Sequence, residues 1–146
     1  MKSAIKRIGQ LFRLTSHERQ LLLYAWCLFP LVALALRILP ATRLVPRGPT
    51  SSATALSLPV DRVGWLVKVA GRYAPARPTC LTEALVLTWM LRRQGIDTTV
   101  RIGVARDARG LRAHAWLEQE GRVIFGSFEG ETYRALRSTV DAAPSA

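Results

Sequence analysis

The stretch RPTCLTEA at residues 77–84 decides how the rest of the chain can be interpreted. Pro78 has no backbone N–H and pushes the residue before it into extended geometry, so a helix cannot run through it. Thr79 is therefore well placed as an N-cap, and apolar residues with helical spacing follow as far as Leu91. This predicts that Cys80 lies in the first turn of a helix, where backbone N–H groups and the positive end of the dipole favour a thiolate.

A histidine with matching chemistry lies further along the chain, in AHAWLE at residues 113–118. The Cys80 helix is expected to stop at Gly95, and residues 98–104 then alternate apolar and polar, as a strand does. Residues 105–112 are interpreted as a charged loop, and residues 113–118 and 122–128 as two strands joined by a turn at Glu120-Gly121. The order is thus a helix that carries Cys80, a strand, a strand that carries His114, and a further strand.

The N-terminal part is basic and apolar. Residues 1–14 form an amphipathic basic segment, and TSHE at residues 15–18 predicts a capping box that opens a helix. Residues 21–36 carry no charge and are interrupted by Pro30, which favours a buried or partner-facing helical hairpin. Membrane association is the alternative, because basic flanks around an apolar helix suit an anionic bilayer surface. Cys27 lies in this run and is expected to pack as a small hydrophobic residue.

Length and composition set further bounds. The chain has 146 residues, 49% of them hydrophobic, and a net charge of +11. One modest core is expected, organised as a helical region at 1–44, a linker at 45–59 and a core at 60–146. The charge favours an acidic peptide, protein surface or lipid as partner, whereas no zinc-finger or helix-turn-helix pattern favours nucleic acid. Two cysteines fit a reducing cytoplasm, and with two dispersed histidines they predict neither a zinc site nor another cofactor.

This order of elements resembles the core of the papain-like and transglutaminase-like cysteine enzymes. The local sequences PTCL at 78–81, RRQGI at 92–96, HAWLE at 114–118 and GRV at 121–123 resemble the lasso-peptide biosynthesis B proteins, in the split form that carries only the leader peptidase. The resemblance runs from about residue 5 to residue 134. It implies an α+β fold, in which a helical N-terminal part precedes a transglutaminase-like or papain-like core with the cysteine helix packed on a small antiparallel sheet.

The resemblance also implies a function and partners. The protein would be a cytoplasmic cysteine peptidase that removes the leader from a ribosomally made lasso-peptide precursor. It would work with a separate leader-recognition protein and with an ATP-dependent lasso cyclase. The Cys80 thiolate would attack the peptide carbonyl, His114 would accept and return the proton, and the Cys80 backbone N–H would donate to the oxyanion. Trp116 is expected to pack in the sheet beside the site, with a substrate contact as the alternative.

The third catalytic residue is the least defined. The family pattern has an Asp on the strand after the histidine, which orients the imidazole. Counting back from the turn places His114 opposite Ser127, or opposite Gly126 after a shift of one residue, and neither is an acid. Glu129 is the diagonal neighbour on the face of Ser127 and is the predicted acid, ahead of Glu118. A Cys–His dyad, with Ser127 or a backbone carbonyl holding the ring, also stays open.

Three other functions fit the same residues. A non-catalytic module of this fold would use its groove only to hold a peptide. A membrane-peripheral adaptor would use residues 1–39 as its anchor. A transglutaminase would use the same cysteine and histidine for acyl transfer to an amine instead of to water.

Overall fold

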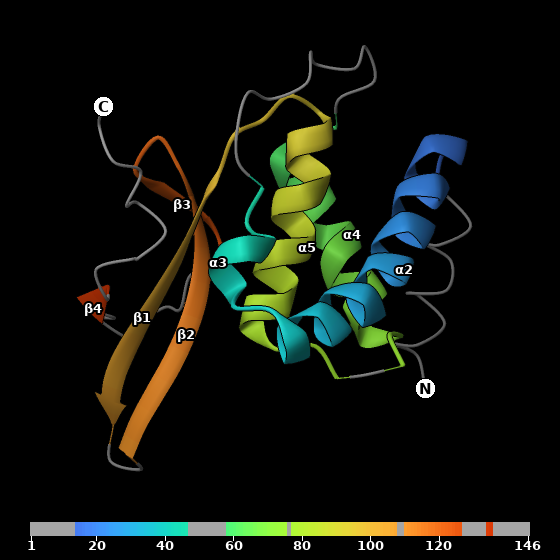
Figure 1. Ribbon diagram of the computed structural model, residues 1–146. Helices are drawn as coiled ribbons and strands as arrows, with labels where there is room; N and C mark the ends of the chain where they lie inside the picture. The colour runs from blue at the N-terminus through green and yellow to red at the C-terminus, as the bar shows by residue number, and fades with distance from the viewer. Residues whose placement is uncertain (1–13, 47–57, 76, 108–109, 127–133, 136–146) are drawn as a thin grey trace, which may run out of the picture.

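The computed structural model describes residues 14–46, 58–75, 77–107, 110–126 and 134–135. Its helices and strands appear in Figure 1 in the order α2 (Ser16–Ile38), α3 (Ala41–Leu44), α4 (Val60–Arg72), α5 (Cys80–Arg93), β1 (Thr99–Asp107), β2 (Gly110–Gln119), β3 (Arg122–Phe125) and β4 (Arg134–Ala135). The strands form one antiparallel sheet in the order β3-β2-β1-β4.

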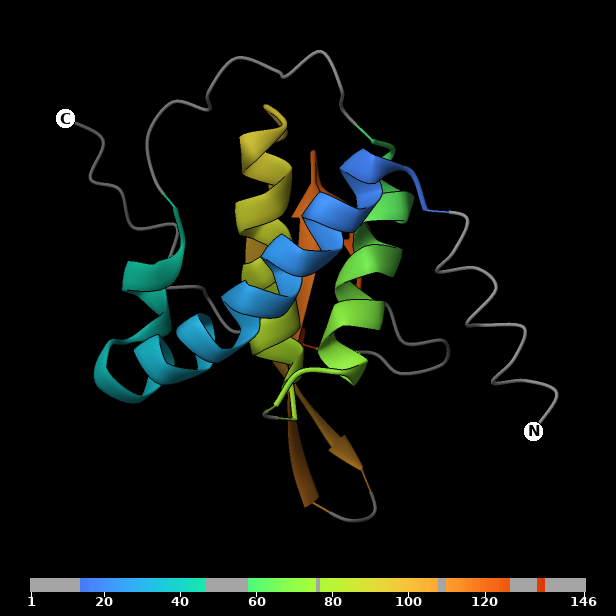
Figure 2. The same cartoon turned by 90° about the vertical axis from the view of Figure 1, so that its right-hand side faces the viewer.

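The elements are arranged in three layers. Helices α4 and α5 pack on one face of the sheet, and α2 crosses both on the side away from it (Figures 1 and 2). Helix α5 is therefore covered by the sheet on one side and by α2 on the other, which explains why most of its residues are buried. The predicted α+β fold, with a helical N-terminal part ahead of a cysteine-bearing helix on a small antiparallel sheet, is confirmed.

Helix α2 begins with the predicted capping box. The Glu18 N–H donates to Thr15 Oγ1 at 3.3 Å, and the Thr15 N–H donates to Glu18 Oε2 at 2.8 Å. The predicted hairpin is wrong, because α2 is one helix that continues through Pro30 to Ile38. Proline removes one hydrogen bond, to the carbonyl of Trp26, and packing of α2 against α4 and α5 outweighs that loss.

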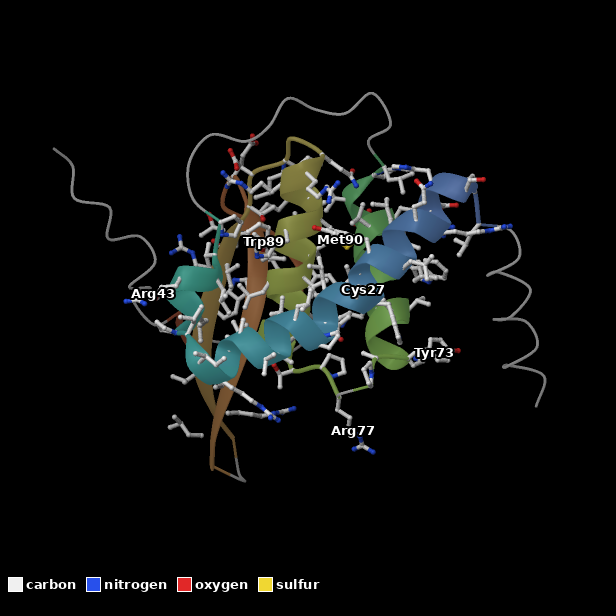
Figure 3. All side chains as sticks on the ribbon, turned by 45° about the vertical axis from the view of Figure 1, so that its right-hand side comes forward. Cys27, Arg43, Tyr73, Arg77, Trp89 and Met90 are labelled. Atoms are coloured by element: carbon white, nitrogen blue, oxygen red, sulfur yellow. The ribbon has the colours of Figure 1, made fainter. Side chains whose placement is uncertain are left out.

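The two sides of α2 differ in burial although both are apolar. Ala25, Phe29 and Val32 are buried in the core that α4 and α5 also form. The opposite side, which we call the outer stripe, is exposed and consists of Leu23, Trp26, Cys27, Leu31, Leu34 and Ile38. Figure 3 shows α2, with Cys27, in front of α4 and α5. The expected packing of Cys27 is therefore wrong: in a run that is apolar all round, hydrophobicity alone does not indicate which side faces the core.

Helix α5 has the boundaries that local capping predicts. Thr79 is its N-cap, and its side chain accepts a hydrogen bond from the Thr82 N–H. At the other end the helix stops at Arg93, and Gly95 follows with φ +79°, a conformation that glycine adopts without strain. These ends place Cys80 in the first turn of the helix.

The hairpin of β1 and β2 is longer than the alternation pattern predicts. The predicted loop at 105–112 is wrong, because β1 reaches Asp107 and Ala105 pairs with Arg112 across the ladder. Backbone pairing needs no apolar alternation, which marks a strand only where one face is buried. The turn at Glu120 and Gly121 is confirmed, with φ of +50° and +76° as a tight hairpin turn requires.

The ends of the predicted linker are held against α5. The Trp89 indole N–H donates to the Leu44 carbonyl at 3.0 Å, and Arg92 Nη1 donates to the Pro46 carbonyl at 3.2 Å. The Leu58 N–H donates to Gln94 Oε1 at 3.0 Å. Residues 47–57 and the amphipathic segment at 1–13 lie outside the described residues, so the division into regions at 1–44, 45–59 and 60–146 stays a prediction.

Glu18 joins α2 to α4 and gives a pH-dependent stability. Its carboxylate accepts a hydrogen bond from Arg62 Nε at 2.6 Å, and this bond lowers the pKa of Glu18 below its ordinary value. A lowered carboxyl pKa stabilises the fold above the unfolded-state pKa, about 4.3 for glutamate, and that stabilisation is lost as pH falls through the folded-state value.

We therefore expect Glu18→Gln to lower the free energy of unfolding by about 1–2 kcal/mol near pH 7, through loss of the ion pair and weakening of the capping box. The difference from the wild type should shrink as pH falls below about 4. Urea denaturation at several pH values measures this, with exposed Glu120→Gln as a control that should change little. A difference that stays constant down to pH 3 would contradict the assignment.

Candidate active site

Cys80 is the first residue of α5 and carries a half-buried free thiol. The Thr79 carbonyl accepts the Glu83 N–H at 3.0 Å, and Thr79 Oγ1 accepts the Thr82 N–H at 3.2 Å. Neither bond uses the Cys80 N–H, which belongs to the four N–H groups that a helix start leaves without an intrahelical acceptor. The local structure therefore supplies both a thiol and an N–H donor at one point.

His114 lies on β2, opposite Gly103 of β1, and is 9% exposed. Its Nε2 is 2.6 Å from the carbonyl oxygen of Gly126, the residue that follows β3. The strand and this hydrogen bond hold the ring from two sides. A backbone carbonyl was one of the groups that the sequence left open for this role.

One cleft brings the two predicted residues together. It has a volume of about 480 Å³ and is lined by Lys68, Pro78, Cys80, Glu83, Arg112, Ala113, His114, Ala115, Phe125 and Gly126. Cys80 enters it from the start of α5, and His114 enters it from the middle of β2, which packs against α5. A thiol and an imidazole in one cleft are the two groups that nucleophilic catalysis by cysteine needs.

Three further cleft residues, Lys68, Glu83 and Phe125, are joined by an ion pair and a cation–π contact. Lys68 Nζ lies 3.2 Å from Glu83 Oε2 and 4.8 Å from the centre of the Phe125 ring. The contacts tie α4, α5 and the end of β3 together on one side of the cleft. Sequence reasoning missed Lys68 and Phe125, because they come from elements far apart in the chain and match no local motif.

Trp116 is held in the sheet next to His114. Their rings are stacked with centroids 6.3 Å apart and an angle of 22° between the planes. The indole N–H donates to Glu118 Oε1 at 2.8 Å, and Glu118 Oε2 lies 3.1 Å from Arg101 Nε. Trp116 is only 8% exposed, so packing beside the site accounts for it, and a substrate contact stays a prediction. Glu118, the second-choice acid, is thus bound by Trp116 and Arg101.

The residue opposite His114, which would be the third catalytic residue, cannot be found by counting along a regular hairpin. A β-bulge between Leu117 and Glu118 shifts the register, so that Leu117 pairs with Phe125. The bulge lies between His114 and the turn, so counting residues back from the turn does not give the residue opposite His114. Glu129, the predicted acid, and Ser127 lie outside the described residues.

In the part of the chain that the structure describes, no three His, Cys, Asp or Glu side chains gather in a group that could hold a metal ion.

Comparison with known protein families identifies the superfamily of the chain. A family model described as the transglutaminase-like superfamily matches residues 21–138, which include Cys80, His114 and most of α2. The match covers well over half of the chain, and the protein therefore belongs to the transglutaminase-like superfamily, which includes cysteine peptidases. No curated protein and no solved structure matches the chain.

Proposed function

We propose that the protein is a cysteine peptidase whose nucleophile is Cys80 and whose general base is His114. The observation that carries this proposal is that both side chains line one cleft, with the thiol at a helix start. In the proposed reaction the thiol proton moves to His114, the sulfur bonds to the peptide carbonyl carbon, and the leaving amine takes the proton from His114. Water then attacks the thioester, which releases the acid and restores the thiol.

We further propose a substrate: the precursor of a lasso peptide, from which the enzyme removes the leader. The support is the sequence resemblance to the split B proteins and the family membership of residues 21–138. A separate leader-recognition protein would present the precursor, and an ATP-dependent cyclase would use the product, in the cytoplasm. The net charge of +11 suits an acidic leader or partner surface. The outer stripe of α2 offers an apolar surface for the partner protein.

Cleavage of a precursor peptide tests the proposal. With the leader-recognition protein present, we expect the wild type to release the leader, and Cys80→Ala and His114→Ala to lower the rate at least about 1,000-fold. Glu120→Ala is the control, because Glu120 is exposed in the turn between β2 and β3 and does not line the cleft, and this variant should keep the wild-type rate. Mass spectrometry of the products measures both the extent and the site of cleavage.

The same experiment separates the alternatives. Wild-type cleavage by Cys80→Ala would contradict the nucleophile. Binding of the peptide without cleavage by the wild type would favour the non-catalytic binding module. A product whose mass shows incorporation of an added amine, in place of hydrolysis, would show transglutaminase acyl transfer.

A membrane-peripheral protein is the second candidate, and the outer stripe favours it. Helix α2 is long and apolar enough to cross a membrane by length and composition, with a mean hydropathy of 2.1 over its best window, a property that a core helix or a signal sequence shares. Ala25, Phe29 and Val32 pack in the core, so in this fold α2 would lie on a bilayer and not across it. Exposed Arg19 and Arg37 stand at the two ends of the stripe, where they would meet anionic headgroups.

Sedimentation with vesicles tests this candidate. If the stripe binds membranes, the protein should sediment with vesicles of phosphatidylserine and phosphatidylcholine at low salt, and Leu31→Glu should lower the bound fraction at least about tenfold. Leu111→Glu is the matched control, because Leu111 is also an exposed leucine but lies on β2. Recovery of the wild type in the supernatant at low salt would exclude the membrane role.

A further inference from the structure

We propose that the backbone carbonyl of Gly126 is the group that orients His114, in the place that an acid takes in the family pattern. This inference rests on the proposed function of Cys80 and His114. Gly126 is a positioning residue, since it would act only through the imidazole. The role depends on the absence of a side chain at this position, which lets the backbone lie close to β2.

The hydrogen bond fixes which nitrogen of His114 carries the proton. Nε2 is 2.6 Å from the Gly126 carbonyl oxygen, and a carbonyl oxygen can only accept. Nε2 is therefore the protonated nitrogen of the neutral ring, and Nδ1 carries the lone pair. An imidazole held in this tautomer can accept the Cys80 proton at Nδ1 without first moving a proton of its own.

The bond also strengthens when the proton moves. Transfer from the Cys80 sulfur to Nδ1 leaves a thiolate and an imidazolium, and the Nε2–H then donates to Gly126 from a charged ring. The carbonyl supplies a fixed dipole at the place where positive charge develops. It keeps no charge of its own, so no buried carboxylate is needed at this position.

Only glycine fits where this carbonyl lies. Gly126 has φ +81°, which other residues adopt with strain. A Cβ at this position would lie 3.1 Å from the Ala115 carbonyl oxygen, 3.2 Å from Trp116 Cα and 3.3 Å from Trp116 Cβ. Two of these three atoms belong to the β2 backbone, which cannot give way as the end of a flexible side chain can. A side chain at 126 would therefore push the carbonyl away from His114.

The wall against which Gly126 packs is itself held in place. Trp116 is bonded through its indole N–H to Glu118, and Glu118 is paired with Arg101 on β1. The chain of contacts from Arg101 to Glu118, Trp116 and Gly126 ends at the His114 ring. This gives Trp116 and Glu118 a role in positioning, in addition to packing in the sheet.

Kinetics of two glycine variants test the proposal. We expect Gly126→Ala to lower kcat for precursor cleavage about 10- to 100-fold with KM changed less than about threefold, because the imidazole would lose its fixed orientation in the cleft that Cys80 also lines. Gly121→Ala is the matched control: its φ is +76°, but a Cβ there would meet no atom within 4 Å. It carries the same backbone strain and should keep the wild-type kcat. Wild-type kcat in Gly126→Ala would overturn the proposal.

Glu129→Gln separates the carbonyl from the predicted acid. We expect this variant to keep kcat within about threefold of the wild type. A loss as large as that of His114→Ala would assign the orienting role to Glu129 and overturn the proposal.

An NMR measurement tests the tautomer without any substrate. The protein has two histidines, so the ring nitrogens of ¹⁵N-histidine-labelled wild type are assigned by comparison with His17→Gln. At a pH where the ring is neutral, we expect His114 to be protonated at Nε2 and not at Nδ1. A proton on Nδ1 would overturn the proposal even if the peptidase is active. Protonation at Nε2 in a protein that cleaves nothing would leave the orientation intact and reject the proposed function instead.

Discussion

The burial of α5 between the sheet and α2 is the constraint on which the rest of the structure depends. Residues 84–88 are buried one after another, and Met90 and Leu91 are almost completely so. Complete burial of one such side chain contributes about 1.5–3 kcal/mol, so a helix covered on two sides cannot rotate or slide without a large loss. The start of the helix, with Thr79 as its cap, is thereby fixed in space. Cys80, the first residue of α5, is thereby held in place in the lining of the cleft.

The sheet holds His114 through strand pairing and a hydrogen bond, whereas Cys80 is held by the packing of a helix. β2 is paired on both sides, with β1 from Gly110 to Glu118 and with β3 at its end. His114 therefore has a fixed backbone, and the contact with Gly126 adds a fixed ring orientation. A nucleophile on a helix and a base on a strand are useful together only if both are held to within a fraction of an ångström. The layered packing of α4, α5 and the sheet provides this kind of support for both residues.

The sequence predicted what depends on neighbouring residues and missed what depends on distant ones. The Thr15 and Thr79 caps and the hairpin turn at Glu120 were predictable because capping and turn chemistry act within a few residues. Cys80 and His114 were singled out by residue type and by the order of elements, and the structure places both in the lining of one cleft. The continuity of α2 through Pro30, the strand pairing over 105–107 and the exposure of Cys27 were missed, because tertiary packing and cross-strand hydrogen bonds determine them. The carbonyl at Gly126 has no side chain to mark it in a sequence.

The measurement that tests the central claim most directly is the rate at which iodoacetamide alkylates Cys80, because it needs neither substrate nor partner. Mass spectrometry of peptides distinguishes this thiol from Cys27, which serves as an internal control. If His114 removes the thiol proton, His114→Ala should slow alkylation of Cys80 at neutral pH at least about tenfold and leave Cys27 unchanged. Equal rates for Cys80 in the wild type and in His114→Ala would contradict the pairing of the two residues.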